Sequence, residues 1–550
     1  MESSPRLLTK DGLPIVAHTA DQYATLAQRA AWLLVGVGMV LRLMRYLMQF
    51  PLWGDECHLA DNFLTRDFLG LLRPLDHCQV APIGYLWIEL ATVKLFGFSE
   101  LTLRLPSIVS SLAALLLFRR VAFRALSPLA ALLAVAFFAM SYYQVRHAAE
   151  VKPYASDVLM STILVALAVE YWRQPGATRW LWYLAAVAPL AVLISLPSVF
   201  VAGAVGLGVA MIVWRNRSRS AWAALAVYAA TLGASFAVVC AVSVSSQDAA
   251  WGERMRDFWA TSFPPPITQP LRFIKFLATA HTGRMFAYPI GGERGASTAT
   301  FLLSLIAFAV LCRRRAWPML ATCLGMFVLA FTAAVLHRYP YADTERMVQY
   351  MGPVICLLAG LGAATVIGAI AWAQWRRRLL QAALIFFVAV ALGTAVRDLL
   401  HPYKGWDDWA HIGFARWFWT QAGGTGDMVC VKSELGYEPW QFTEPWSYFC
   451  YQRLCSPRHR TRQPPRGVEA LAADRPVRCV EFGVDIAPRN DEQHQAWMRA
   501  MTARFDLTSQ AQYKVHLGRE QGREVYGVYD LYQFMPKLPQ STAANSVIQR

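Results

Sequence analysis

Two adjacent carboxylates in the tetrapeptide WGDE, residues 53–56, are the side chains of this chain best placed to do chemistry. Asp55 and Glu56 come directly after the first long apolar segment, where a membrane helix would emerge into water. Burying charges at the edge of a bilayer is costly, so acidic residues at such a position are usually solvated or functional. They also suit the N-terminus of a helix, and capping a helix is the alternative role for this pair.

The elements that position these carboxylates are predicted to be membrane helices. The 550 residues are 56% hydrophobic and 16% charged, whereas a soluble domain carries about 25% charged residues. Apolar runs of about 17 to 25 residues, enough to cross a bilayer core of about 30 Å, recur up to residue 400. Residues 1–28 are polar and lack the apolar core and cleavage site of a signal peptide. We therefore expect the first membrane helix to remain as an anchor.

We predict eleven membrane spans in a polytopic α-helical protein. Pro128 suits the first turn of the third span, which is expected to end at Val145. The split at Pro197 and the break around Arg313 decide whether the count is odd. The spans lie near residues 30–50, 104–118, 128–145, 154–172, 179–196, 198–214, 221–243, 298–312, 316–336, 350–372 and 379–398.

Arginine placement predicts the orientation. With a cytoplasmic N-terminus, five successive inside loops are rich in arginine and the short outside loops are poor in cations, which is the positive-inside pattern. Part of the net charge of +16 is then a topology signal, and arginines spread over five loops do not form the single basic face of a nucleic-acid-binding protein. The inside arginines are Arg119, Arg120, Arg124, Arg173, Arg179, Arg215, Arg217, Arg219, Arg313, Arg314, Arg315, Arg376, Arg377 and Arg378.

This orientation divides the chain into four parts. Residues 1–29 form a cytoplasmic segment, 30–398 the transmembrane domain, 399–535 an extracytoplasmic soluble domain, and 536–550 a tail that we expect to be disordered. The protein would be integral to the inner or plasma membrane. Most of the concentrated polar chemistry falls outside, in the loops 51–103, 146–153, 244–297 and 337–349 and in the soluble domain.

The first outer loop is predicted to hold two helices that lie along the membrane surface. Leu59 to Leu72 has apolar residues at helical spacing, and Ile83 to Phe96 is apolar with few charges and is followed by Gly97. Such helices lie on a bilayer rather than cross it. The next span is expected to start at Arg104. The loop would thus hold Asp55 and Glu56 at the bilayer surface.

Cysteine placement agrees with an oxidising outer compartment. The six cysteines outside the spans form an even set, which favours disulfides: Cys57, Cys78, Cys430, Cys450, Cys455 and Cys479. A Cys57–Cys78 bridge would staple the first loop, and the alternative is that both are small buried thiols. We expect at least one disulfide in the soluble domain. Metal binding by its cysteines is disfavoured because no CxxC pair is present.

Three outer motifs, in order along the chain, resemble those of the GT-C glycosyltransferases. The first loop carries WGDE (53–56), QVAP (79–82) and LFGFSELTLRLPS (95–107); the second carries YYQVRHAAEVKPYASD (142–157); the late loop and its following span carry TERMVQYMGPVICLLAGLG (344–362). The resemblance covers residues 30 to about 400. The most similar branch includes protein mannosyltransferases, the aminoarabinose transferase of lipid A and Rgt-type lipopolysaccharide sugar transferases.

The resemblance implies many membrane helices, an active site at the outer face, a polyprenyl-phosphate sugar as donor and inversion at the anomeric carbon. In the family the acidic residue at the Asp55 position acts as the catalytic carboxylate. A second family position matches Glu150. The Arg-Pro-Tyr that usually follows is here Lys152, Pro153 and Tyr154, which keeps a cation but loses bidentate phosphate geometry.

The residues also suit this chemistry on their own terms. Sugar transfer from a phosphate donor to a hydroxyl needs a base for the incoming proton and cations for the departing phosphate. A single inverting displacement needs one base and no covalent intermediate. Asp55 is the candidate base. Arg346 and Lys152 are the candidate phosphate ligands, with Arg146 behind them.

The neighbouring side chains leave alternatives open. Glu56 would position the acceptor or tune Asp55, since adjacent like charges raise one pKa. The sequence contains no dedicated cluster of metal ligands, although His58 with Glu56 could join a divalent metal site. His58 is more commonly an ordinary solvated histidine, Arg346 could simply reach the lipid headgroups, and Tyr142, Tyr143, Tyr339 and Tyr341 could form an aromatic belt.

Two outer segments carry less information. In the loop 244–297 the run Pro264–Pro266 breaks regular structure, residues 269–285 suit another surface helix, and a lid over the site is the hypothesis that relatives suggest. In the soluble domain DMVCV (427–431) predicts a strand and residues 512–534 a hairpin around 518–522, which favours an α/β or α+β domain. Trp440, Trp446, Tyr448 and Tyr451 could stack on sugars but are more commonly core residues.

The sequence therefore favours a membrane glycosyltransferase that moves a hexose or pentose from a polyprenyl-phosphate donor to a glycolipid, polysaccharide or protein acceptor. Nucleic acid is excluded as a partner. The alternative is a flippase or transporter of lipid-linked sugars, which should show internal repeats and charges or broken helices near the midplane. No repeat is detectable. A catalytically inactive scaffold is disfavoured by the intact Asp55.

Overall fold

The structure, a computed structural model, describes residues 17–50, 52, 54–76, 79–244, 259–291, 295, 297–341, 344–400, 406–419, 428–431, 467–484, 491–520 and 523–537. The chain divides into two compact units. One comprises residues 1–50 and 65–401, and the other comprises residues 51–64 and 402–550.

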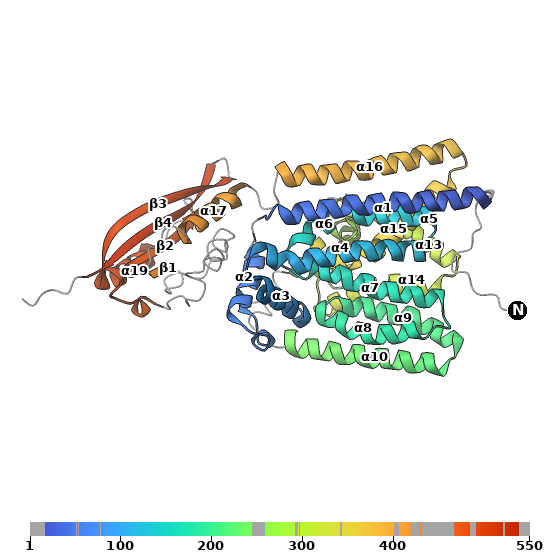
Figure 1. The fold of residues 1–550 in the computed structure, drawn as a ribbon, viewed down its shortest axis with the longest axis horizontal. Coiled ribbons are helices and arrows are strands. Elements are labelled where there is room, and N and C mark those ends of the chain that lie inside the picture. The colour runs from blue at the N-terminus through green and yellow to red at the C-terminus, as the bar shows by residue number, and fades with distance from the viewer. Residues whose placement is uncertain are drawn as a thin grey trace, which may run out of the picture. The chain divides into compact units, whose positions relative to one another are not determined.

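The first unit is a bundle of long apolar helices that run side by side (Figure 1). Their side chains form one continuous core. The α-helices are α1 (Ala17–Leu47), α3 (Ile83–Phe96), α4 (Glu100–Ala125), α5 (Pro128–Ala139), α6 (Tyr142–Arg146), α7 (Tyr154–Arg173), α8 (Arg179–Ile194), α9 (Ser198–Asn216), α10 (Arg219–Val239), α12 (Pro270–Thr282), α13 (Thr298–Arg313), α14 (Trp317–Val335), α15 (Gly352–Ala369) and α16 (Ala373–Leu400). Short helical turns are η1 (Gly70–Leu72), η3 (His147–Ala149), η4 (Cys240–Val244), η5 (Ala260–Ser262), η6 (Arg284–Phe286) and η7 (Glu345–Met351).

Each of the eleven predicted spans coincides with a helix or a bent pair of helices in this bundle. Eight helices among the described residues are long and apolar enough to cross a membrane. The bent pair α5–α6 would be a ninth, and α8 and α13 are shorter apolar helices. The chain is thus a multi-pass membrane protein, and the count of eleven stays a prediction.

Close helix packing in the bundle depends on glycines. A Cβ atom on Gly360 of α15 would lie 2.5 Å from the backbone nitrogen of Ala134 in α5, and one on Gly362 would overlap the carbonyl oxygen of Leu303 in α13. Lipid offers no hydrophobic driving force between helices, so small residues that let backbones approach are what hold membrane helices together. α15 is therefore fixed between α5 and α13.

Three local predictions differ from the structure. α4 begins at Glu100 rather than Arg104, because the Ser99 side chain accepts a hydrogen bond from the Thr102 amide and caps the helix four residues earlier. The predicted helix over 59–72 is instead α2 (Gly54–Thr65) followed by η1, with a turn in which the Gly70 amide donates to Asp67. The third span is broken after Ala139. By contrast, α3 has the predicted bounds, and Gly97 ends it with a φ of 81° that favours glycine.

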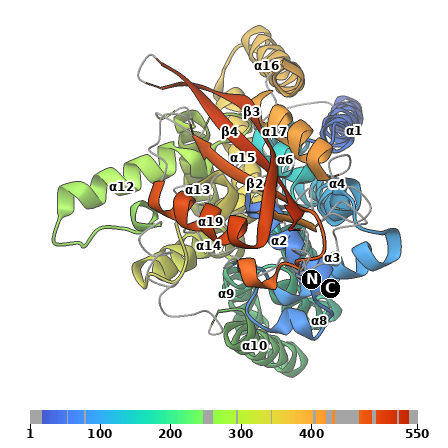
Figure 2. The ribbon, with the colours of Figure 1, turned by 90° about the vertical axis from the view of Figure 1, so that its left-hand side faces the viewer.

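The loop that precedes α13 contains the predicted additional helix. α12 covers most of residues 269–285 and, seen along the bundle axis, extends sideways from the spans (Figure 2). Residues 264–266 have no regular structure, as their prolines predict. Residues 245–258 and 292–294 of the same loop lie outside the described residues.

The second unit contains a four-stranded sheet in the order β1-β2-β4-β3. Its strands are β1 (Met428–Val431), β2 (Val477–Val484), β3 (Phe505–Glu520) and β4 (Arg523–Pro536), and its helices are α2, α17 (Trp406–Trp417) and α19 (Asp491–Arg504), with the turn η10 (Val468–Ala470). β1 and β2 are parallel, and β4 pairs antiparallel with β2 and β3. The predicted strand and hairpin are both present.

Alternation along the strands gives this sheet two buried faces. Val480 and Tyr529 pack with Phe414 and Phe418 on one face, while neighbouring residues of β2 and β4 pack with Trp497 of α19 on the other. Successive side chains of a strand point to opposite faces, so α17 and α19 cover opposite sides of the sheet. The aromatic residues predicted at 440–451 and the tail beyond 537 lie outside the described residues.

The cysteines give one correction. Cys57 carries a reduced, buried thiol that donates to the Leu52 carbonyl oxygen at 3.5 Å, so the predicted Cys57–Cys78 bridge is wrong and the buried-thiol alternative holds for Cys57. Cys479 of β2 is disulfide-bonded, which confirms the expectation for the soluble domain.

Candidate active site

The candidate site is built on the broken span α5–α6. α5 ends at Ala139, and α6 starts at Tyr142 at an angle of 51° to it. The Tyr142 amide donates to the carbonyl oxygen of Pro289 at 2.9 Å, which ties the break to the long loop. The chain then runs through α6 and η3 to Glu150 and enters α7 at Tyr154. This bend gathers the polar residues of the second motif into one compact segment.

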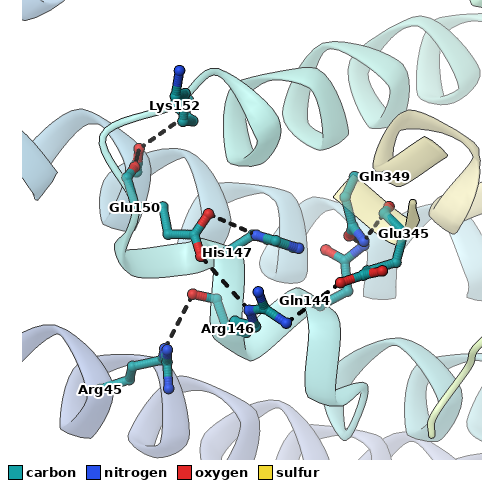
Figure 3. Close-up of polar contacts among 9 residues, drawn as sticks. Arg45, Gln144, Arg146, His147, Glu150, Lys152, Glu345 and Gln349 are labelled. Carbon is teal, nitrogen blue, oxygen red and sulfur yellow. Dashed lines mark hydrogen bonds and ion pairs between the residues drawn. The ribbon is translucent and has the colours of Figure 1, made fainter. Parts of the chain in front are cut away.

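Arg146 lies between two carboxylates at the end of α6 (Figure 3). Its Nε atom is 3.7 Å from Oε1 of Glu150, and its Nη1 atom is 3.4 Å from Oε1 of Glu345. The three side chains are only 12%, 7% and 11% exposed. Charges this well buried are tolerated when they are paired, so the cluster fixes the guanidinium on both sides.

The turn that carries Glu150 is itself held in place. His147 Nδ1 lies 2.9 Å from Oε2 of Glu150, and the Ser107 hydroxyl of α4 donates to the Glu150 carbonyl oxygen at 2.6 Å. The His147 ring also packs edge-on against Tyr154, with 5.1 Å between centroids. Tyr154, predicted as a phosphate-binding residue, is thus buried and packs against His147 in the same segment.

Lys152 follows Glu150 and points to a different partner. Its Nζ atom donates to Oε1 of Gln79 at 2.7 Å. Gln79 begins the QVAP motif of the first loop, so the structure joins the first two sequence motifs through this bond. Lys152 is itself buried, with 8% exposure.

Glu345 and Arg284 complete the cluster, and sequence reasoning missed both. Glu345 opens η7 and lies 3.8 Å from Nη1 of Arg284, which comes from the loop after α12. The Gln349 amide donates to the Glu345 carbonyl oxygen at 2.9 Å, and Gln144 of α6 donates to Gln349 at 2.7 Å. The sequence offered one signal for Glu345, because it directly precedes the predicted phosphate ligand Arg346 in the third motif. No signal in the sequence pointed to Arg284.

Arg346, which follows Glu345 in η7, contacts an aromatic ring. Its guanidinium lies over the ring of Trp259, 5.6 Å from the centroid. Such a cation–π contact stabilises an arginine at an interface by about 0.5–2 kcal/mol. The structure therefore brings together Arg146 and Glu150 from the predicted set and adds Glu345, while Arg346 stands against an aromatic ring beside them.

Buried aromatic side chains lie near η7. Tyr341 is 2% exposed, and its hydroxyl lies 3.2 Å from Nε2 of His281. Burial lowers the pKa of His281 from its ordinary value, partly offset by its bond to the Leu277 carbonyl, so this histidine is neutral at pH 7. Burial also raises the pKa of Tyr341. Tyr341 and Tyr142 are buried in the protein and do not form a lipid-facing belt.

Taken together, the contacts describe a preorganised group of charges in which Arg146, Lys152 and Arg284 supply the cations. Arg146 is held by two carboxylates, Glu150 by a histidine and a serine, and Lys152 by a glutamine. Fixed cations of this kind stabilise a negative charge that develops during a reaction, because little reorganisation is needed when it forms.

No protein-family model and no curated protein matches this chain. The crystal structure of ArnT from Cupriavidus metallidurans in the apo state is similar, with a TM-score of 0.50 and 13% identity over 90% of this chain and 97% of that one. ArnT is an aminoarabinose transferase of the GT-C superfamily. The chain has the GT-C fold.

Further GT-C structures resemble the chain more distantly. ArnT from the same organism bound to undecaprenyl phosphate has a TM-score of 0.48 and 14% identity, over 90% of this chain and 97% of that one. AglB, an oligosaccharyltransferase from Archaeoglobus fulgidus in complex with an inhibitory peptide and a dolichol-phosphate, has a TM-score of 0.46 and 11% identity over 80% of this chain. This chain covers 65% of AglB.

Asp55 and Glu56 occupy the first turn of α2. Glu56 is buried with 1% exposure, and His58 with 5%. Glu56 and His58 are two residues apart in one helix, a spacing at which side chains do not face each other. Within the described part of the chain, no group of three or more His, Cys, Asp or Glu side chains is placed to hold a metal ion.

Proposed function

We propose that this protein is an integral membrane glycosyltransferase. It transfers a sugar from a polyprenyl-phosphate donor to a hydroxyl of a glycolipid, polysaccharide or protein at the extracytoplasmic face. The observation that carries the proposal is the buried Arg146–Glu150–Glu345 cluster on a broken span of a GT-C fold. Similar structures hold undecaprenyl phosphate or dolichol-phosphate, which supports a lipid phosphate as the donor carrier.

The reaction is a single inverting displacement. The acceptor hydroxyl attacks the anomeric carbon while Asp55 takes its proton, and the bond between that carbon and the phosphate oxygen breaks with its electron pair leaving on the phosphate. The released polyprenyl phosphate gains negative charge, which Lys152 and Arg146 stabilise, with Arg346 beside them. Glu56 positions the acceptor or tunes its neighbour.

The experiment that tests this proposal compares cells that lack the protein with cells that carry the wild type or Asp55→Asn. The readout is a mass-spectrometric profile of glycolipids, polysaccharides and glycoproteins. We expect one sugar to be missing from one acceptor in the deletion and in Asp55→Asn, and present with the matched control Asp61→Asn, which removes an acid from the same helix. Unchanged transfer in Asp55→Asn at normal expression would refute the role of Asp55.

A flippase for lipid-linked sugars is the second candidate, and the broken span favours it. Broken helices in transporters form binding sites near the bilayer midplane. α5 has twelve residues before the break, which places the break about 18 Å from Pro128 at 1.5 Å per residue. That is past the middle of a core of about 30 Å. A flippase would move the lipid-linked sugar across sealed vesicles without releasing polyprenyl phosphate, whereas a transferase releases it.

A further inference from the structure

Arg45, near the end of α1, joins three parts of the bundle. Its Nη1 atom lies 2.6 Å from Oδ1 of Asp398 in α16, and the two side chains are 3% and 2% exposed. Its Nε atom donates to the carbonyl oxygen of Arg146 at 3.1 Å. Its guanidinium also lies over the Phe50 ring, 4.7 Å from the centroid. One buried cation thus contacts the last span, the candidate site and the segment that leads to WGDE.

Arg42, about one turn earlier on α1, donates hydrogen bonds to the end of α5, on the other side of the break. It is fully buried and donates to the carbonyl oxygens of Ala139 at 3.0 Å and Phe138 at 3.4 Å, the last two residues of α5. It also donates to the Gly38 carbonyl oxygen and the Ser111 hydroxyl. α1 therefore places one arginine at the end of α5 and another at the end of α6.

The break makes these contacts necessary. The last carbonyls of a helix have no donor within the helix, and an unsatisfied backbone group at membrane depth costs several kcal/mol. Arg42 supplies donors for α5, and Arg45 supplies one for the Arg146 carbonyl. Without them the bent form of α5–α6 would lose part of its advantage over a continuous helix.

Asp398 in turn fixes Arg45. α16, which the structure describes throughout, lies beside α1 at the edge of the bundle (Figure 1) and buries Phe387, Val390, Ala391, Thr394 and Asp398, of which only Asp398 is charged. A buried ion pair that loses one partner leaves an uncompensated charge and is strongly destabilised. The next residue back, Arg397, also lies over the ring of Tyr142 in α6, 4.5 Å from the centroid. α16 thus reaches the broken span directly through Arg397 and indirectly through the contact of Asp398 with Arg45.

We propose that Arg45 is a positioning residue for Arg146, and that Asp398 holds Arg45 in the orientation this requires. The pair sets where the end of α6 lies, and hence where the Arg146 guanidinium meets Glu150 and Glu345. This role rests on the proposed function only in its effect on sugar transfer. The effect on the geometry of the broken span is independent of it.

The test uses full-length protein in nanodiscs with four variants. Asp398→Asn and Arg45→Lys weaken the pair while keeping most of its volume, and the double variant Arg45→Met/Asp398→Leu removes both charges together. Glu170→Gln is the matched control, because it removes the ion pair between α4 and α7 in which Arg120 lies 3.4 Å from Glu170. Replacing both partners of a buried pair by apolar residues often leaves stability unchanged.

The first readout is amide hydrogen exchange over residues 139–153, which needs no activity. We expect faster exchange there in Asp398→Asn and in the double variant, and no change in Glu170→Gln. Exchange equal to that of the wild type in the double variant would overturn the positioning role, whether or not the protein transfers sugar.

The second readout separates position from folding. We expect the double variant to lose less stability than Asp398→Asn, because it leaves no uncompensated charge. It should nevertheless lose at least about tenfold in kcat, since small displacements of a catalytic group cost up to about 100-fold. Arg45→Lys should retain more activity than the double variant. A double variant with wild-type kcat would contradict the proposal. If the wild type itself transfers no sugar, the proposed function fails while the exchange result still decides the positioning role.

Discussion

Arg146 offers the sharpest prediction about the cluster, because its charge has two separable effects. At an effective dielectric of about 20, unit charges 3.4 Å apart attract by about 5 kcal/mol, which is the separation of Arg146 from Glu345. Desolvation offsets much of this, and removing one partner from a buried pair costs about 3–5 kcal/mol. We therefore expect Arg146→Met to lower the free energy of unfolding by about that amount.

Arg146→Met should also abolish the contribution that the Arg146 charge makes to turnover. Removing one preorganised charge or donor from a site that stabilises an anion costs about 100- to 1,000-fold in kcat. The triple variant Arg146→Met/Glu150→Gln/Glu345→Gln removes the uncompensated carboxylates together with the cation. We expect it to recover most of the lost stability and none of the lost turnover.

Two measurements check this reasoning on purified protein. The unfolding midpoint in detergent reports stability, and release of polyprenyl phosphate reports turnover. If the triple variant recovered turnover along with stability, the Arg146 charge would serve only the fold. If Arg146→Met kept the wild-type midpoint, the cluster would not be the buried pair that its 7–12% exposure indicates.

Three further predictions concern the fold and its orientation. Gly362→Ala should destabilise the bundle by at least about 1–3 kcal/mol through overpacking, since the new Cβ would overlap the Leu303 carbonyl oxygen, whereas Gly368→Ala in the same helix meets nothing within 4 Å and should leave the midpoint unchanged. Burial raises the pKa of the Glu89 carboxyl well above its ordinary value, so the folded protein holds a proton that the unfolded chain releases above about pH 4.3. The unfolding free energy should therefore fall by about 1.4 kcal/mol per pH unit from that pH up to the raised pKa. If the same slope persists in Glu89→Gln, Glu89 is not its cause. A reporter enzyme active only outside the cytoplasm should be active when fused at the C-terminus, and activity only of a cytoplasmic reporter would overturn the predicted orientation.

Hydropathy predicted most of the bundle, because in lipid a long apolar run must be helical to satisfy its backbone. The same signal could not show the break after Ala139. Residues 128–145 are apolar on both sides of it, and what stabilises it comes from distant residues, namely Arg42 on α1 and the Pro289 carbonyl oxygen. Local chemistry did identify α3 through Gly97 but missed the Ser99 cap of α4.

The site was predictable only in part, for a related reason. Arg146, Glu150 and Lys152 lie within seven residues of one motif, so spacing alone placed them near one another. Glu345 reaches Arg146 from 199 residues away and Arg284 enters from another loop. Contacts of that kind depend on how the helices pack, which a single sequence does not reveal.

The central claim is that Asp55 removes the acceptor proton in transfer from a polyprenyl-phosphate sugar. Its most direct test is the rate at which purified protein in nanodiscs releases polyprenyl phosphate from the donor in the presence of the acceptor that the cell profiles identify. We predict that Asp55→Asn slows this release by about 100- to 10,000-fold, the usual contribution of a general base, while Asp61→Asn leaves it within about twofold of the wild type. Release by Asp55→Asn at the wild-type rate would contradict the account.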